Sequence, residues 1–109
     1  MSNHELIDQR SIAFGRAIAA RIAAEPDVIT HARITLARWL TTCAPQVRPG
    51  LLEWQAALEG PVDGVVTLLT SPDERATRLR QSNPFAGVLS NQERNAIIRQ
   101  FRANDTPAA

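Results

Sequence analysis

Proline constrains this sequence more than any other residue type, because the prolines separate segments whose apolar residues repeat with a helical period. A proline lacks a backbone donor, and the residue before it avoids helical angles. The dividing residues are Pro26, Pro45, Pro49, Pro61 and Pro72. Few windows alternate apolar and polar residues as a half-buried strand would. The pattern predicts an all-α fold, a compact bundle of five to six helices.

The predicted helices cover residues 3–24, 26–43, 51–59, 61–69, 72–81 and 91–103. Residues 45–50 contain two prolines and a glycine, and they are predicted to form a turn. A structured loop with Pro and Gly is expected before the last helix. Residues 1–103 are predicted to form a single helical domain, followed by a flexible C-terminal tail over residues 104–109.

Two capping boxes are predicted at the starts of the last two helices. Ser71 is followed three residues later by Glu74, and Ser90 is followed at the same spacing by Glu93. In such a box the serine caps the helix and the glutamate reaches back to the serine backbone. Gly60 is well placed to end the helix over residues 51–59.

Small and aromatic residues indicate where the helices pack. Ser11 and Gly15 lie beside the apolar stripe of the first helix, so another helix can approach closely there. Trp39 and Trp54 both stand in apolar stripes, and core packing is expected for each, with one of them only half covered.

All twelve basic residues are arginine, and the formal net charge is only +1. Arginine forks onto phosphate or carboxylate groups, but a GC-rich genome would also favour arginine over lysine. A dedicated nucleic-acid module would normally carry a stronger basic excess. The net charge therefore argues against such a module, although local patches remain open.

The residues that catalysis requires are sparse. His4 and His31 are the only histidines, and Cys43 is the only cysteine, so no metal site, cofactor or intramolecular disulfide is expected. The acidic residues Asp73, Glu74 and Glu93 stand in first helical turns, where the helix dipole favours negative charge. No phosphate-binding glycine loop or nucleophile elbow is present. We therefore expect the protein not to be an enzyme.

The N-terminal sequence lacks the apolar region of a signal peptide, and no apolar run approaches the about 20 residues that span a bilayer. A cytoplasmic location without membrane contact is therefore expected.

The connector over residues 82–89 is apolar, whereas connectors are usually polar because they run over the surface. Phe85, Val88 and Leu89 either pack as a small cluster against the core or anchor another protein. In the first case Gly87 would take a backbone angle that other residues disfavour. Both interpretations stay open at this point.

Arginine concentrates in the C-terminal third, and three interpretations fit. The last two helices could contact DNA as a helix-turn-helix, although the connector is roughly twice as long as that motif's usual turn of about three or four residues. The arginines could contact a protein partner. They could also form a solvated surface, with Glu74 pairing with Arg78 at i,i+4.

Two blocks of the sequence carry a resemblance. The first is Ala32-Arg33, Leu36 and Arg38-Trp39, and the second is Arg78-Leu79-Arg80-Gln81-Ser82-Asn83-Pro84-Phe85-Ala86-Gly87-Val88-Leu89-Ser90 with Glu93-Arg94. From the first helix to Arg102 the chain resembles a family of small bacterial all-helical proteins encoded beside nucleotidyltransferase-like toxins. The resemblance implies an antitoxin-like protein that binds a co-encoded toxin-type enzyme.

The functional hypothesis is a non-catalytic protein-interaction module that binds and restrains such an enzyme. The partner-binding residues are predicted to be Arg78, Arg80, Gln81, Asn83, Phe85 and Arg94. Phe85 would insert into the partner, and the arginines would pair with its acidic groups. The alternative is a DNA-binding transcriptional regulator that uses the Arg-rich C-terminal helices. No small-molecule substrate is expected.

Overall fold

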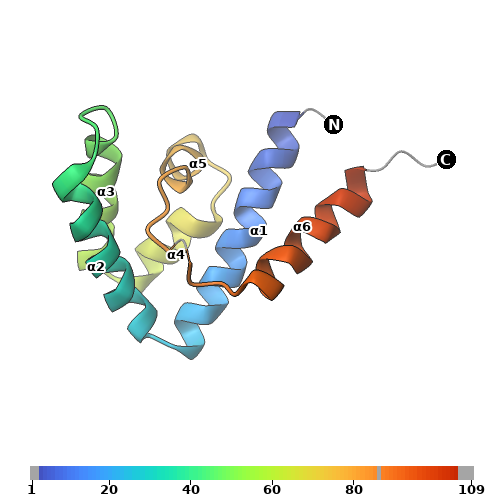
Figure 1. Cartoon of the computed structure of the whole chain (residues 1–109), viewed down its shortest axis with the longest axis horizontal. Coiled ribbons are helices and arrows are strands. Elements are labelled where there is room, and N and C mark those ends of the chain that lie inside the picture. Colours follow the sequence, from blue (N-terminus) through green and yellow to red (C-terminus); the bar gives the residue numbers. More distant parts are fainter. Residues whose placement is uncertain (1–2, 86, 106–109) are drawn as a thin grey trace.

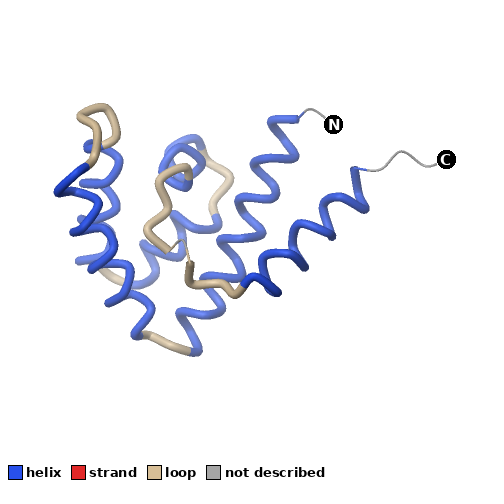
Figure 2. Tube along the Cα trace, in the orientation of Figure 1, coloured by secondary structure: helices blue, strands red, loops and turns tan. Residues whose placement is uncertain are grey.

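The computed structural model describes residues 3–85 and 87–105, and within them every regular element is a helix (Figures 1 and 2). The elements are α1 (Asn3–Ala24), α2 (Asp27–Thr42), α3 (Arg48–Glu59), α4 (Val62–Thr70), α5 (Glu74–Arg80) and α6 (Asn91–Asp105). The predicted all-α bundle of five to six helices is confirmed. Among the helices described, none combines the length and the apolar character needed to span a bilayer.

Helix α1 is the element around which the others are arranged, because it contacts α2, α4, α5 and α6. Helices α2 and α3 form a pair at one side of the molecule, and α4 and α5 lie between that pair and α1 (Figure 1). Helix α6 lies at the opposite edge, where α1 is the one described helix that it contacts. The last helix is therefore the least embedded element of the fold.

The core is built from aliphatic side chains around one tryptophan. Trp54 is fully buried, and its indole Nε1 donates a hydrogen bond to the carbonyl oxygen of Leu79 at 2.7 Å. Phe85 meets the Trp54 ring edge-on, with ring centroids 6.2 Å apart. Trp39 is only half-buried at the margin of this core. The expectation that one of the two tryptophans would be half covered is confirmed.

Gly15 allows α1 and α4 to approach closely, as the small residues beside the α1 stripe predicted. A Cβ atom at this position would collide with the backbone carbonyl oxygen of Leu69. Because backbone cannot rotate away as a flexible side chain can, only glycine is compatible with this helix crossing.

Several helix ends differ from the prediction. Helix α3 begins at Arg48, within the predicted turn over residues 45–50, because Pro49 is tolerated in its first turn. Helix α6 continues to Asp105, two residues into the predicted tail, and residues 106–109 lie outside the described part of the chain. Gly60 ends α3, with its N–H donating to Ala57 O.

The two predicted capping boxes have opposite outcomes. At α6 the box is confirmed, because Ser90 N donates to Glu93 Oε1 at 2.9 Å and Glu93 N donates to Ser90 Oγ at 3.1 Å. At α5 the predicted Ser71 cap is wrong. Asp73 caps that helix, accepting from Ala76 N at 2.7 Å, because Ser71 already ends α4.

Candidate functional site

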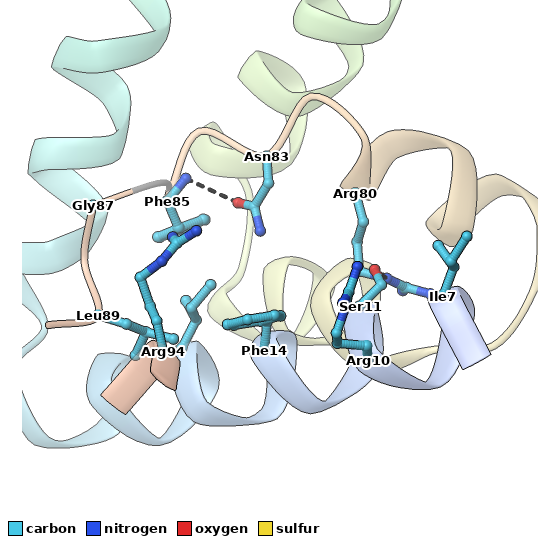
Figure 3. Close-up of a pocket in the computed structure, with 11 residues that line it drawn as sticks. Ile7, Arg10, Ser11, Phe14, Arg80, Asn83, Phe85, Gly87, Leu89 and Arg94 are labelled. Carbon is cyan, nitrogen blue, oxygen red and sulfur yellow. Dashed lines mark hydrogen bonds between the residues drawn. The ribbon is translucent and has the colours of Figure 1, made fainter. Parts of the chain in front are cut away.

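A groove of about 290 Å³ opens where α1, the end of α5, the connector residues Asn83, Phe85, Gly87 and Leu89 and the start of α6 meet (Figure 3). We call it the arginine groove. Its lining residues are Ile7, Arg10, Ser11, Phe14, Ile18, Arg80, Asn83, Phe85, Gly87, Leu89 and Arg94. Segments separated by most of the chain therefore contribute to one concave surface.

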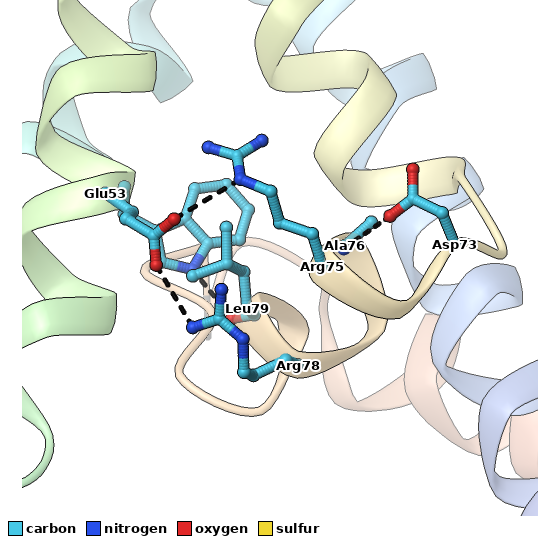
Figure 4. A network of polar contacts seen from close by, with 7 residues as sticks. Glu53, Asp73, Arg75, Ala76, Arg78 and Leu79 are labelled. Atoms are coloured by element: carbon cyan, nitrogen blue, oxygen red, sulfur yellow. Dashed lines mark hydrogen bonds and ion pairs between the residues drawn. The ribbon is translucent and has the colours of Figure 1, made fainter.

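Four of the six predicted site residues line this groove, namely Arg80, Asn83, Phe85 and Arg94. Gln81 instead lines a second hollow, which it shares with Trp39, Cys43 and Val47. Arg78 is exposed on the other side of α5 (Figure 4). The structure thus brings four of the six predicted residues together in one groove and places Gln81 and Arg78 on other surfaces.

The floor of the arginine groove is apolar and belongs to the core. Phe85 is only 1% exposed and Leu89 only 5%, whereas Phe14 is half-buried and faces the groove (Figure 3). The expected insertion of Phe85 into a partner is therefore wrong for this conformation, because its ring already packs on Trp54. Gly87 has a φ of 90°, the left-handed angle that the core-packing interpretation required.

Arg80 is a second correction, because its side chain is buried rather than free to pair with a partner. Its Nε donates to Ser11 Oγ at 2.7 Å, and its Nη1 donates to Leu68 O at 2.9 Å and to Ser71 O at 2.7 Å. Burial lowers the pKa of Arg80. The guanidinium ties α1, α4 and α5 together beneath one end of the groove.

Two exposed arginines stand over the groove. The guanidinium carbon of Arg94 lies 5.5 Å from the centroid of the Phe14 ring, a cation–π contact that orients the side chain. Arg10 lies toward the other end, near Ser11 and Ile7 (Figure 3). Between them, Asn83 Oδ1 accepts from the Phe85 backbone N–H at 2.9 Å.

The prediction missed Arg10, Ser11 and Phe14, the contribution of α1. A signal was present, since Phe14 belongs to the predicted apolar stripe of the first helix and Arg10 and Ser11 stand next to that stripe. That stripe was expected to be covered by other helices. In the structure its N-terminal part stays open, and Ile7 is 56% exposed.

The acidic residues whose pKa is shifted have structural roles. The Glu53 carboxylate accepts hydrogen bonds from Arg78 Nη1 at 3.0 Å and from Arg75 Nε at 3.3 Å (Figure 4). The hydrogen bond from Arg78 is the main cause that lowers the pKa of Glu53. The predicted pair of Glu74 with Arg78 is wrong, because Arg78 turns to Glu53 on α3.

Two further carboxylates act at helix starts. The backbone hydrogen bond from Ser90 is the main cause that lowers the pKa of Glu93, and Arg21 Nη2 adds an ion pair at 2.7 Å. The backbone hydrogen bond from Ala76 likewise lowers the pKa of Asp73. A general acid needs a raised pKa, so these shifts fit capping and ion pairing rather than proton transfer.

Among residues 7–85 and 87–102, whose side chains are described, no cluster of three or more His, Cys, Asp or Glu could hold a metal ion. His31 is exposed on α2, and the side chain of His4 lies outside the described set. Cys43 is a free, half-buried cysteine at the end of α2.

Comparison with known family models, curated proteins and solved structures finds no match to this chain.

Proposed function

We propose that this chain is a non-catalytic protein-interaction module, antitoxin-like in role, that binds and restrains a co-encoded toxin-type enzyme. The observation that supports the proposal is the arginine groove, where exposed guanidinium groups stand directly beside apolar side chains. Such a juxtaposition suits the core of a protein interface, where Arg and aromatic residues are enriched. The likeness of the residue 78–94 block to antitoxin-like proteins supplies the kind of partner.

The arginine groove would form the centre of the interface, with a buried area of about 1,600 Å² in total. Arg94 and Arg10 would pair with acidic groups of the enzyme, and Asn83 would add a hydrogen bond. Phe85 would act from below by holding the connector in place, since its ring is buried against Trp54. The restraint would come from covering the mouth of the enzyme's active site.

Co-expression with the neighbouring gene tests the proposal. The neighbour is induced with and without this chain, and growth is measured, followed by size-exclusion chromatography of the two purified proteins. We expect relief of growth arrest and co-elution in a single complex. Unchanged arrest together with separate elution would refute the antitoxin-like function.

A DNA-binding role has less support from this geometry. The two helices of a helix-turn-helix pack on each other, whereas α5 has seven residues and makes no contact with α6 within the described chain. Arg78 is engaged with Glu53, and Arg80 is buried. A gel-shift assay on the upstream operator at low salt is expected to show no specific complex, and a salt-sensitive specific complex would restore this alternative.

A further inference from the structure

The polar side chains that line the arginine groove offer hydrogen-bond donors to its interior. Arg10 and Arg94 carry N–H groups only. The Asn83 carbonyl oxygen is already engaged by the Phe85 backbone, which leaves its NH₂ group for the groove (Figure 3). Ser11 Oγ accepts from Arg80 and still carries a hydroxyl proton that can be donated. A ligand that satisfies this set must supply acceptors.

The described side chains that line the groove carry charge of one sign. Among the lining residues whose side chains are described, every ionisable one is an arginine and none is a carboxylate. Arg80 adds a buried positive charge whose direct hydrogen bonds go to hydroxyl and carbonyl oxygens, and the carboxylates of Asp8 and Asp73 interact with it electrostatically. Charges interact more strongly where water is partly excluded. An anion would therefore be attracted to the arginine groove.

The other half of the surface is apolar. Phe14, Phe85 and Leu89 contribute apolar side chains to the lining, alongside the arginines (Figure 3). The volume of about 290 Å³ is at the small end of ligand sites, which span ~300–1,000 Å³. The space therefore suits one or two side chains rather than a long segment.

We propose that the arginine groove receives an acidic segment of the protein partner, in which a carboxylate stands next to an aromatic or large aliphatic side chain. The carboxylate accepts from Arg94 and the Asn83 amide, Arg10 adds positive charge from the other end of the groove, and the apolar side chain lies against Phe14. This inference rests on the proposed function for the kind of partner. Arg94 is already held over Phe14, so little side-chain ordering is needed when the segment binds.

The probe for the test is 4-phenylbutyrate, which joins one phenyl ring to one carboxylate, titrated into the labelled full chain and followed by NMR. We expect saturable shifts of the Phe14 ring and the Asn83 amide, with a dissociation constant of about 1 mM or weaker for so small a ligand. 4-Phenylbutanol, which keeps the ring but lacks the charge, should bind roughly tenfold more weakly.

Charge-reversal variants locate the site. Arg10→Glu and Arg94→Glu should each weaken phenylbutyrate binding at least ~10-fold, since a like charge replaces a donor. Arg16→Glu is the matched control on α1, because Arg16 is exposed and does not line the groove. Arg94→Gln keeps a donor without the charge, and it covers the case in which Arg94→Glu loosens α6. Thermal unfolding of every variant verifies the fold.

Equal binding of the alcohol and the acid, shifts confined to other surfaces, or unchanged binding in Arg10→Glu and Arg94→Gln would each overturn the inference. The co-expression experiment separates this result from the proposed function. If wild type and Arg10→Glu relieve growth arrest equally, the groove assignment fails and the antitoxin-like function stands. If phenylbutyrate binds as expected but wild type gives no relief, the antitoxin-like function fails and the carboxylate preference of the groove stands.

Discussion

Replacement of Phe85 by alanine distinguishes the two interpretations of the apolar connector, core cluster or exposed anchor. The ring is 1% exposed and packs edge-on against Trp54. Removing about 150 Å² of buried apolar surface costs about 4 kcal/mol at 25 cal/mol per Å². This agrees with the range of about 3–5 kcal/mol for Phe→Ala in protein cores. We therefore expect the free energy of unfolding to fall by about 4 kcal/mol.

Urea unfolding followed by far-UV circular dichroism measures this change, and the midpoint of thermal unfolding should fall by roughly 15–25 °C. The fluorescence of Trp54 should also shift, because a neighbouring ring is lost. Phe101→Ala is the matched control. Phe101 is only half-buried on α6, the helix at the edge of the fold, so its loss should cost less than about 2 kcal/mol.

The reasoning would be refuted if Phe85→Ala unfolded within about 0.5 kcal/mol of wild type, the range of ordinary surface substitutions. In that case the connector would not be part of the core in solution. A normal stability combined with lost partner binding would instead favour the exposed-anchor interpretation.

Three further predictions concern the helix junctions. Gly15→Ala should lower the free energy of unfolding measured in urea, because the new methyl group would overpack against the Leu69 backbone at a cost of about 1–3 kcal/mol or more. This cost exceeds the gain in helix propensity, which is about 1 kcal/mol. An unchanged or higher stability would contradict the close crossing of α1 and α4. Asp73→Ala should lower the midpoint of thermal unfolding more than Ser71→Ala does, since Asp73 holds Ala76 N; the reverse order would restore the Ser71 cap. The pKa of Glu93 is lowered in the folded chain. Its ionised carboxylate therefore stabilises the folded state at pH values above its unfolded pKa of about 4.3. This stabilisation is lost as the pH falls through the pKa of Glu93 in the folded state. Glu93→Gln should therefore flatten the acid side of a stability–pH profile, and an identical profile would contradict that contribution.

Local signals were sufficient for most of the helices. The long segments that form α1 and α2 have enough residues to display a 3.6-residue period, and the Ser90 box depends on residues that are only three positions apart. The prediction of a Ser71 capping box was wrong for a reason that is also local. Ser71 ends α4 by donating its N–H to Thr67 O, so the next helix takes its cap from Asp73. Serine and aspartate are about equally good caps, and the sequence offered no way to choose between them.

The candidate site depends on contacts that no local pattern reports. The predicted role of Arg80 in partner binding requires an accessible guanidinium group, and α5 has too few residues to show which of its faces is buried. The burial of Arg80 arises from contacts with Ser11 on α1, 69 residues away in the sequence, and with Leu68 on α4. Phe85 was recognised as an apolar residue needing a partner, but the identity of that partner, Trp54, depends on how α3 packs.

The net charge of the chain conceals the charge of the arginine groove. Eleven acidic residues nearly balance twelve arginines overall, but Asp73 and Glu93 serve helix starts, and Glu53 binds two arginines on a different surface. These three carboxylates accept hydrogen bonds from backbone N–H groups or from arginines that do not line the groove, while Arg94 remains over Phe14 and Arg10 lies toward the other end of the groove. The positions of the helix-capping carboxylates thus leave a nearly neutral protein with one surface that is locally positive and partly apolar. Ser11→Asp would place a carboxylate in the groove. It should therefore weaken anion binding there more than a substitution elsewhere on the surface that lowers the net charge by the same amount.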